Sequence, residues 1–265
     1  MTEVNQTLYI PLYGKALVSR QGILLSDRKA EEIWEKEGFP LKGKSKSRWL
    51  AYYMAMRAAV FDNWLTAQMH AQPESVVLHI GCGLDSRCER VGCKGHPWYD
   101  VDFPDVIAVR RQYYSESEFY HMLAGDARES AWLAAISGNL PAIVVSEGIS
   151  MYLEPEALRG FLRNLGGHFP AVRLLMDCYT VRGAKMTKLR NPVSEVGVTE
   201  TYGIDNPQAL TQGTGFALAG EPDMTPPELI AALPGTEQSI FRSIYAGSIS
   251  RSMYRMYEFQ TEKEC

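Results

Sequence analysis

Five short, mostly apolar runs punctuate the middle of the chain, at 76–80, 98–102, 119–124, 141–146 and 172–177. Runs of apolar and β-branched residues predict strands that are buried on both faces of a sheet. Stretches with helical periodicity separate them, including 105–118 and 154–165. Alternation of strand and helix at this spacing predicts an α/β fold, with a mostly parallel sheet and helices on both of its faces.

The first 70 residues predict a helical arm. Residues 7–20 are largely apolar, 27–37 form a charged amphipathic pattern, and 48–69 are apolar nearly all round. A helix that is apolar on every side is buried against the rest of its domain.

The last third of the chain is less regular. Residues 180–214 are polar and rich in Gly and Pro, which predicts an insertion of loops and short helices over the substrate. Residues 215–220 predict a short strand, and weak alternation at 239–244 and 254–259 predicts the last two strands as an antiparallel edge. We expect one domain over 1–265, comprising a cap (1–70), a core (71–180), the insertion (181–214) and C-terminal strands (215–265).

A glycine turn follows the first strand, with the sequence Gly81-Cys82-Gly83-Leu84-Asp85-Ser86. Glycine tolerates positive φ and has no Cβ, so a ligand can lie against the backbone there. The dinucleotide fingerprint requires a third glycine where this chain has Ser86. The turn therefore suits a nucleoside without phosphates better than NAD.

Acids stand at the ends of two neighbouring strands. Asp102 can accept hydrogen bonds from both hydroxyls of a ribose, or it can cap the helix that begins near Asp105. Asp126 can accept the amino group of an adenine, or it can cap a helix over 130–136.

Two cations lie within apolar segments. A buried Arg57 requires an anionic partner, either a protein carboxylate such as Asp62 or Asp85 or the carboxylate of a ligand. Lys15 is either a ligand-binding residue or a lysine that extends its ammonium group into solvent.

Charge and composition exclude several classes of protein. A net charge of −4 and the lack of a basic patch argue against a nucleic-acid partner. No apolar stretch reaches the roughly 20 residues that span a membrane, and the polar N-terminus lacks a signal-peptide pattern, so we expect a cytoplasmic protein. Five cysteines predict reduced thiols, and Cys88, Cys93 and His96 match no zinc pattern, so we expect no metal.

Four motifs in order resemble the leucine carboxyl methyltransferase family, which includes the tetracenomycin-type O-methyltransferases of polyketide biosynthesis. They are the turn at 81–87, Tyr99-Asp100-Val101-Asp102-Phe103-Pro104, Gly125-Asp126, and Ser146-Glu147-Gly148-Ile149-Ser150-Met151-Tyr152-Leu153. The resemblance covers most of 7–180. It implies a Rossmann-like class I fold with a seven-stranded sheet, and S-adenosyl-L-methionine as the cofactor.

The resemblance also implies roles for individual residues. Arg57, helped by Lys15, would hold the carboxylate of the cofactor's methionine part, and Glu147 would lie near it. The remaining cofactor-binding residues would be Gly81, Cys82 and Gly83 at the methionine and ribose, Asp102 and Phe103 at the ribose, and Asp126 and Ala127 at the adenine.

These observations predict O-methylation of a small molecule. A carboxylate acceptor is ionised at neutral pH, whereas a phenol benefits from a general base, and no histidine is a convincing base here. We expect a carboxylate acceptor, with Tyr13 and Tyr152 lining its pocket, and we name no catalytic residue. The alternatives are a phenolic acceptor, the C-terminal carboxylate of a protein, a non-catalytic nucleoside-binding protein and an NAD-dependent oxidoreductase.

Overall fold

The structure is a computed structural model that describes residues 8–38, 41, 43–93, 95–187 and 200–261. Its strands are β1 (Val76–Ile80), β2 (Trp98–Asp102), β3 (Tyr120–Ala124), β4 (Ala142–Ser146), β5 (Val172–Tyr179), β6 (Phe216–Gly220) and β7 (Tyr254–Thr261). The longer helices are α1 (Tyr9–Gln21), α2 (Arg28–Glu37), α3 (Arg48–Ala71) and α6 (Pro155–His168). The shorter ones are α4 (Arg87–Val91), α5 (Pro104–Arg110), α7 (Val181–Thr187), α8 (Pro207–Thr211), α9 (Pro227–Ala231), α10 (Gly235–Ile240) and α11 (Ser248–Arg251). Short turns of other helix types are η2 (Gly43–Lys46), η3 (Ala131–Ala135), η4 (Ser150–Tyr152) and η6 (Phe241–Tyr245).

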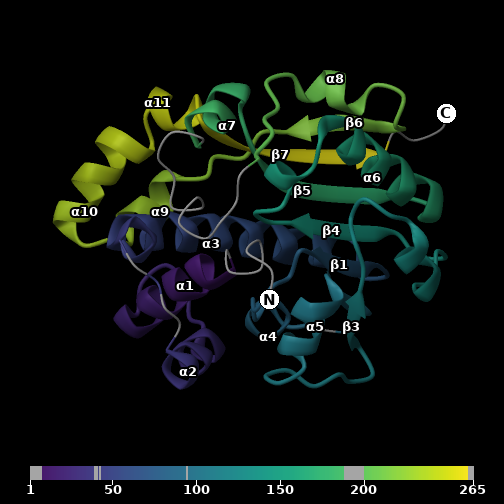
Figure 1. Cartoon of the computed structure of the whole chain (residues 1–265), viewed down its shortest axis with the longest axis horizontal. Helices are drawn as coiled ribbons and strands as arrows, with labels where there is room; N and C mark the ends of the chain where they lie inside the picture. Colours follow the sequence, from purple (N-terminus) through teal and green to yellow (C-terminus); the bar gives the residue numbers. More distant parts are fainter. Residues whose placement is uncertain (1–7, 39–40, 42, 94, 188–199, 262–265) are drawn as a thin grey trace.

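The strands form one seven-stranded sheet in the order β3-β2-β1-β4-β5-β7-β6 (Figure 1). The first five strands pair in parallel. β7 lies antiparallel between β5 and β6. The predicted α/β fold, with its mostly parallel sheet of seven strands, is confirmed.

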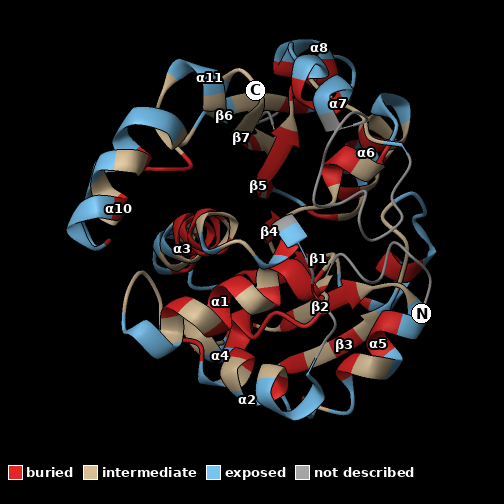
Figure 2. Ribbon diagram, turned by 60° about the vertical axis from the view of Figure 1, so that its left-hand side comes forward, coloured by how far each residue is buried: buried red, intermediate tan, exposed pale blue. Residues whose placement is uncertain are grey.

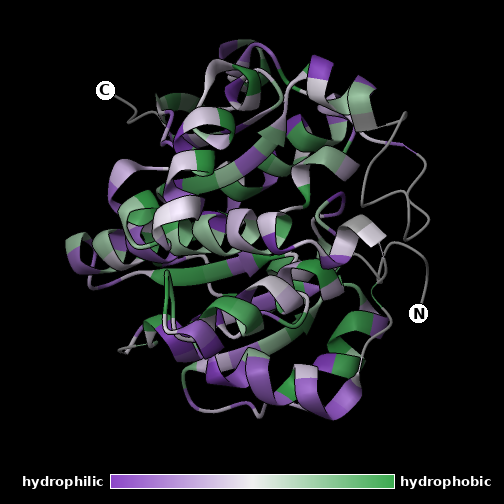
Figure 3. Cartoon of the chain, turned by 90° about the vertical axis from the view of Figure 1, so that its left-hand side faces the viewer, coloured by the Kyte–Doolittle hydropathy of each residue, from purple (hydrophilic) through white to green (hydrophobic). Residues whose placement is uncertain are grey.

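Residues of each central strand alternate between two hydrophobic cores. Val77, Ile143 and Leu175 face the core that contains α1 and α3. Leu78 and Val144 face the opposite core, which contains α6 and η3. Figure 2 shows that the central strands are buried between the helices on the two faces of the sheet. Figure 3 shows hydrophobic residues concentrated on the sheet. Burial on both faces explains why these strands read as continuous apolar runs.

The N-terminal arm is helical, as predicted. α3 buries residues on all sides, among them Tyr52, Met56 and Phe61. α1 packs along α3, and α2 packs on α1. At the start of α2, Asp27 caps the helix by accepting a hydrogen bond from the Ala30 amide at 2.8 Å.

Two predicted elements are wrong. Residues 239–244 are helical in α10 and η6, where Phe241 stacks on Tyr245 four residues later at 4.5 Å and is completely buried. This four-residue spacing of buried side chains is helical, so β6 supplies the edge strand instead. The helix predicted over 105–118 ends at Arg110, whose buried guanidinium donates to the carbonyls of Gly83 and Asp85.

The expectation of reduced thiols is also corrected. Cys88 in α4 and Cys93 are joined by a disulfide, because Gly92 ends the helix with a positive φ and returns the chain toward Cys88. Cys82 and Cys178 are free and buried. Among the described residues there is no cluster of metal ligands and no helix long and apolar enough to cross a membrane.

Candidate functional site

A cavity of about 820 Å³ opens at the carboxyl ends of the parallel strands. Its lining includes eleven of the twelve residues that the sequence predicts for the site: Lys15, Arg57, Gly81, Cys82, Gly83, Asp102, Phe103, Asp126, Ala127, Glu147 and Tyr152. This is the edge at which open parallel sheets bind ligands. The structure therefore brings residues from α1, α3 and the ends of four strands to one place.

Tyr13 lies elsewhere. Its ring packs against Trp34 of α2 at 5.0 Å, and it is not part of the cavity lining. It faces α2 because it falls on a different side of α1 from Lys15. The sequence pattern did not distinguish these two sides, because α1 is apolar on most of its surface.

The glycine turn has the backbone that the sequence predicts. Gly81 has φ of +71° and Gly83 has φ of +51°. A Cβ at Gly81 would lie 2.2 Å from Cγ2 of Ile149, so the turn packs closely against the segment after β4. The amide of Gly83 donates to Oδ2 of Asp102 at 2.7 Å, which ties the turn to the end of β2.

Asp102 holds its carboxylate at the rim of the cavity without capping α5. Oδ1 accepts from the Phe103 amide at 2.7 Å, whereas α5 has Phe103 itself as its N-cap and no side-chain cap. Burial raises the pKa of Asp102 to about 6, and the amides of Gly83 and Phe103 only partly offset this effect. The carboxylate therefore changes its charge close to neutral pH.

Asp126 follows β3 at the other end of the cavity. It accepts hydrogen bonds from the backbone amide and the guanidinium of Arg128, each at 2.9 Å. These bonds lower the pKa of Asp126, although burial opposes them. The N-cap of η3 is Ser130, so the alternative role of Asp126 as its cap is excluded.

Arg57 has two carboxylate partners and a hydroxyl. Its Nε and Nη2 contact Oε1 of Glu147 at 3.0 and 2.9 Å. Its Nη1 donates to Oδ2 of Asp177 at 2.8 Å and to the hydroxyl of Tyr254 at 2.5 Å. The candidate protein partners Asp62 and Asp85 are therefore wrong, because Glu147 and Asp177 are the carboxylates that pair with Arg57.

Asp177 and Tyr254 are residues of the candidate site that sequence reasoning missed, because both contact Arg57. Asp177 is completely buried at the end of β5, and Tyr254 lines the cavity at the start of β7. An acid at the carboxyl end of a parallel strand was the available signal for Asp177. Tyr254 had no local signal, because it reaches the site through the antiparallel pairing of β7 with β5.

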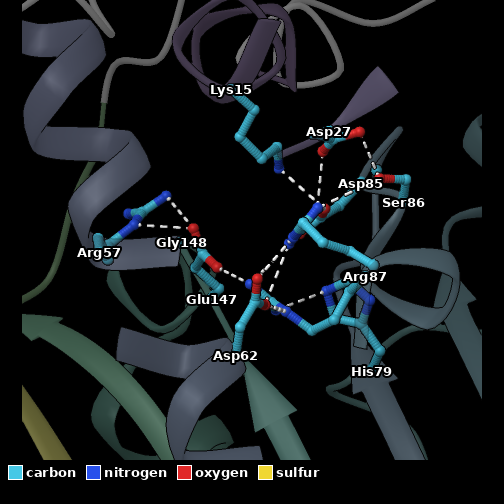
Figure 4. Close-up of polar contacts among 12 residues, drawn as sticks. Lys15, Asp27, Arg57, Asp62, His79, Asp85, Ser86, Arg87, Glu147 and Gly148 are labelled. Carbon is cyan, nitrogen blue, oxygen red and sulfur yellow. Dashed lines mark hydrogen bonds and ion pairs between the residues drawn. The ribbon is translucent and has the colours of Figure 1, made fainter. Parts of the chain in front are cut away.

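Charged side chains continue from the cavity wall into the protein (Figure 4). Lys15 forms an ion pair with Asp85 at 3.0 Å, and both side chains are buried. Glu147 also accepts a hydrogen bond from Arg87, which is completely buried. Although burial opposes it, the charges of Arg57 and Arg87 lower the pKa of Glu147 to about 2, so Glu147 stays ionised.

The rest of the cavity wall is mainly apolar. It includes Leu50, Met54, Met151, Tyr152, Tyr179 and Tyr254. His79 also lines the cavity, but its ring nitrogens contact Asp100 at 3.2 Å and Arg87 at 3.2 Å. Burial lowers the pKa of His79, so its imidazole is neutral at pH 7.

Comparison with known proteins identifies the family. The family model for leucine carboxyl methyltransferase matches residues 3–166. The tetracenomycin polyketide synthesis O-methyltransferase TcmP of Streptomyces glaucescens is 33% identical over 215 residues, which are 79% of this chain and 78% of that protein. The S-adenosyl-L-methionine-dependent methyltransferase dpfgK of Gibberella zeae is 27% identical over 186 residues, which are 64% of this chain and 62% of that protein.

Solved structures support the fold. A DUF574 family protein from Streptomyces avermitilis has a TM-score of 0.56 at 13% identity, over 89% of this chain and 90% of its own. Magnesium protoporphyrin IX methyltransferase from Synechocystis, with bound SAH, has a TM-score of 0.53 at 12% identity, over 89% of this chain and 93% of its own. The chain therefore belongs to the leucine carboxyl methyltransferase family, and it is an S-adenosylmethionine-dependent methyltransferase.

Proposed function

We propose that this methyltransferase transfers a methyl group to a carboxylate oxygen of a small molecule, such as a polyketide-type metabolite. The observation that carries the proposal is the cavity, whose lining combines carboxylates and basic side chains with many apolar residues. Its volume of about 820 Å³ lies in the upper part of the range of roughly 300–1,000 Å³ for small-molecule sites. The name of the Streptomyces relative supports a metabolite of the polyketide type.

The charged residues of the cavity lining fit S-adenosylmethionine. Asp102 would accept the ribose hydroxyls beside Gly83 and Phe103, and Asp126 would accept the amino group of the adenine beside Ala127. Arg57 and Lys15 would hold the carboxylate of the methionine part. A carboxylate already occupies Arg57, because Glu147 contacts two of its nitrogens, so this guanidinium is suited to such a ligand.

When bound, the cofactor supplies a methyl group activated by its positively charged sulfur. The protein has to hold an acceptor oxygen in line with the bond that breaks, and to exclude water. Positioning of this kind can supply up to roughly 7–11 kcal/mol of the barrier. The apolar wall formed by Leu50, Met54 and Met151 supports both roles.

The surroundings of His79 favour a carboxylate acceptor over a phenol. A phenol has a pKa near 10 and benefits from a base that removes its proton. His79 is the histidine in the described lining, and its contacts with Asp100 and Arg87 occupy both ring nitrogens. A carboxylate is already ionised and needs no base.

The segment after β5 supports a closed pocket for a small acceptor. The amide of Tyr202 donates to the Met151 carbonyl at 2.8 Å, and the amide of Ile204 donates to the Tyr179 carbonyl at 2.7 Å. This segment therefore runs beside two residues of the cavity wall. The rest of the insertion predicted at 181–214 includes 188–199, which lie outside the described residues. We propose that the insertion covers the acceptor.

Turnover with labelled methyl donor tests this function. The acceptors are small aromatic and aliphatic carboxylic acids, phenols of matched shape, and a peptide with a free C-terminal carboxylate. We expect base-labile methyl esters of the small acids. Stable methyl ethers of the phenols, or esters of the peptide alone, would refute the proposed acceptor. Titration with S-adenosylhomocysteine and with NAD tests the cofactor site independently of the acceptor. S-adenosylhomocysteine should bind, and NAD should not.

A further inference from the structure

Glu147 is shared by two arginines that differ in their access to the cavity. Its Oε1 contacts Arg57, and its Oε2 accepts a hydrogen bond from Nη2 of Arg87 (Figure 4). Arg57 and Glu147 belong to the cavity lining, whereas Arg87 does not. A ligand in the cavity can therefore reach the first arginine but not the second.

Arg87 is fixed in place from several directions. Its Nε donates to Oδ1 of Asp62 at 2.8 Å, and its Nη2 lies 3.3 Å from Oδ2 of Asp85. Its Nη1 contacts Nε2 of His79 at 3.2 Å, and the guanidinium lies 5.3 Å from the centre of the Phe61 ring. Arg87 has no exposed surface and has contacts on all of its nitrogens, so a ligand in the cavity does not compete for it.

Protein groups contact all three nitrogens of the Arg57 guanidinium. Glu147 contacts Nε and Nη2, while Asp177 and Tyr254 take Nη1. A ligand carboxylate that takes Nε and Nη2 must displace Oε1 of Glu147. The displaced carboxylate stays buried, where an unpaired charge is costly.

Resting on the proposed function, we propose that Arg87 is the positioning residue that retains Glu147 during this exchange. Oε1 of Glu147 contacts Nε and Nη2 of Arg57, the two nitrogens that a ligand carboxylate would take. When an amino-acid group enters, Oε2 stays on Arg87, and Oε1 accepts a hydrogen bond from the ligand ammonium. The exchange suits a ligand that carries both a carboxylate and an ammonium group. The ligand carboxylate takes the place of Oε1 of Glu147 on Arg57, and the ligand ammonium becomes the new partner of Oε1.

The alternative role for Arg87 is purely structural. Through Asp62 it ties α4 to α3, and loss of that tie would weaken every ligand of the cavity. Two ligands separate the roles: S-adenosylhomocysteine carries the amino-acid group, and 5′-methylthioadenosine shares the nucleoside but lacks that group. Positioning of Glu147 affects the first ligand alone.

The test measures the Kd of both ligands by calorimetry for the wild type and for Arg87→Met. A hydrogen bond to a charged group contributes more to the binding free energy than one between neutral groups. We therefore expect Arg87→Met to raise the Kd of S-adenosylhomocysteine roughly 10- to 100-fold. The Kd of methylthioadenosine should stay within about threefold of the wild type, because its contacts are unchanged.

Arg90→Met is the matched control. Arg90 lies on the same helix and contacts Asp62 at 2.5 Å, Asp27 at 2.6 Å and Asp85 at 2.9 Å, but it has no contact with Glu147. Its removal takes the same charge from the same cluster, so we expect it to change the two Kd values by similar factors. A ligand-selective loss in Arg90→Met equal to that in Arg87→Met would overturn the proposal, because the cause would then be the charge of the cluster.

Arg87→Lys keeps the test informative if Arg87→Met does not fold. Lysine keeps the charge but has a single nitrogen in place of the planar guanidinium, whose separate nitrogens contact Asp62 and Glu147. We expect a several-fold loss for S-adenosylhomocysteine and an unchanged Kd for methylthioadenosine. Equal losses for both ligands, or no loss for either, would refute the positioning role. If the folded wild type binds neither ligand, the cofactor site itself is wrong, which is a different result.

Discussion

The proposed contact of Asp102 with the ribose predicts that cofactor binding depends on pH, because the Asp102 carboxylate titrates at about pH 6. Burial raises the pKa of Asp102 from 3.8 to about 6. Accepting both ribose hydroxyls requires the ionised form, since a protonated carboxyl has to donate its own proton. With a pKa of about 6, roughly one tenth of the protein carries the ionised form at pH 5 and roughly nine tenths at pH 7. Affinity for a nucleoside should therefore be about tenfold weaker at pH 5.

The assay is calorimetric titration with 5′-methylthioadenosine at pH 5, 6, 7 and 8. This ligand avoids Arg57 and Glu147, so the titration reports the nucleoside end. Asp126 does not contribute to the change, because its pKa is lowered by Arg128 and it stays ionised over this range. The control is Asp102→Asn, which removes the titrating group and should bind weakly at every pH. A Kd that is constant between pH 5 and pH 7 in the wild type, or a tenfold change that persists in Asp102→Asn, would refute the reasoning.

The same group makes the free energy of unfolding depend on pH. Its pKa is higher in the folded protein than in the unfolded chain, so the folded state retains the proton between about pH 4 and pH 6. Over this window the contribution of Asp102 to stability falls as the pH rises, and it stays low above pH 6. The difference between 3.8 and about 6 corresponds to at most roughly 3 kcal/mol at neutral pH. Bound ribose would offset this cost by hydrogen bonding to the charged form.

Three further substitutions test the fold and the site by urea unfolding. Arg57→Met should lower the free energy of unfolding by roughly 3–5 kcal/mol, because it leaves Asp177 buried without its cation, and it should abolish S-adenosylhomocysteine binding; unchanged stability would contradict the pairing. Gly81→Ala should cost roughly 1–3 kcal/mol, since its φ is +71° and its Cβ would clash. Its control, Gly160→Ala within α6, has open space and should stabilise by roughly 0.5–1 kcal/mol. Phe241→Ala should cost roughly 3–5 kcal/mol if η6 is packed as described, and a loss below roughly 1 kcal/mol would place that ring at the surface.

Local patterns were sufficient for the five parallel strands and for the glycine turn. The run at 76–80 is buried at every position, so its sequence carries the information that β1 lies between two layers. Gly81 and Gly83 both adopt the positive φ that their residue type favours. In these places a few residues that are adjacent in the sequence determine the structure, so the sequence alone is sufficient to predict it.

The partners of Arg57 could not be predicted in the same way. The sequence suggested Asp62 or Asp85, whereas the actual carboxylate partners are Glu147, which follows β4, and Asp177, which lies in β5. The contact with Asp177 joins residues 120 positions apart. Periodicity fixes which side chains are buried, but the register between distant elements decides which of them meet.

At residues 239–244, by contrast, the local pattern itself led to a wrong prediction. Weak alternation at 239–244 suggested a strand, although the buried residue Phe241 packs against Trp49 and Tyr52 of α3. A stretch of six residues contains too few buried positions to separate a period of two from one of 3.6.

The position of β7 between β5 and β6 determines the order in which the strands can pair during synthesis. The chain reaches β6 at Phe216–Gly220, but β6 pairs with β7, which ends at Thr261. A ribosome releases the parallel half of the sheet first, and β6 then has no neighbouring strand until translation has passed β7. Tyr254 arrives in that last segment and completes the hydrogen bonds of Arg57. The growing polypeptide therefore acquires the full set of contacts around Arg57 only after β7 has been made.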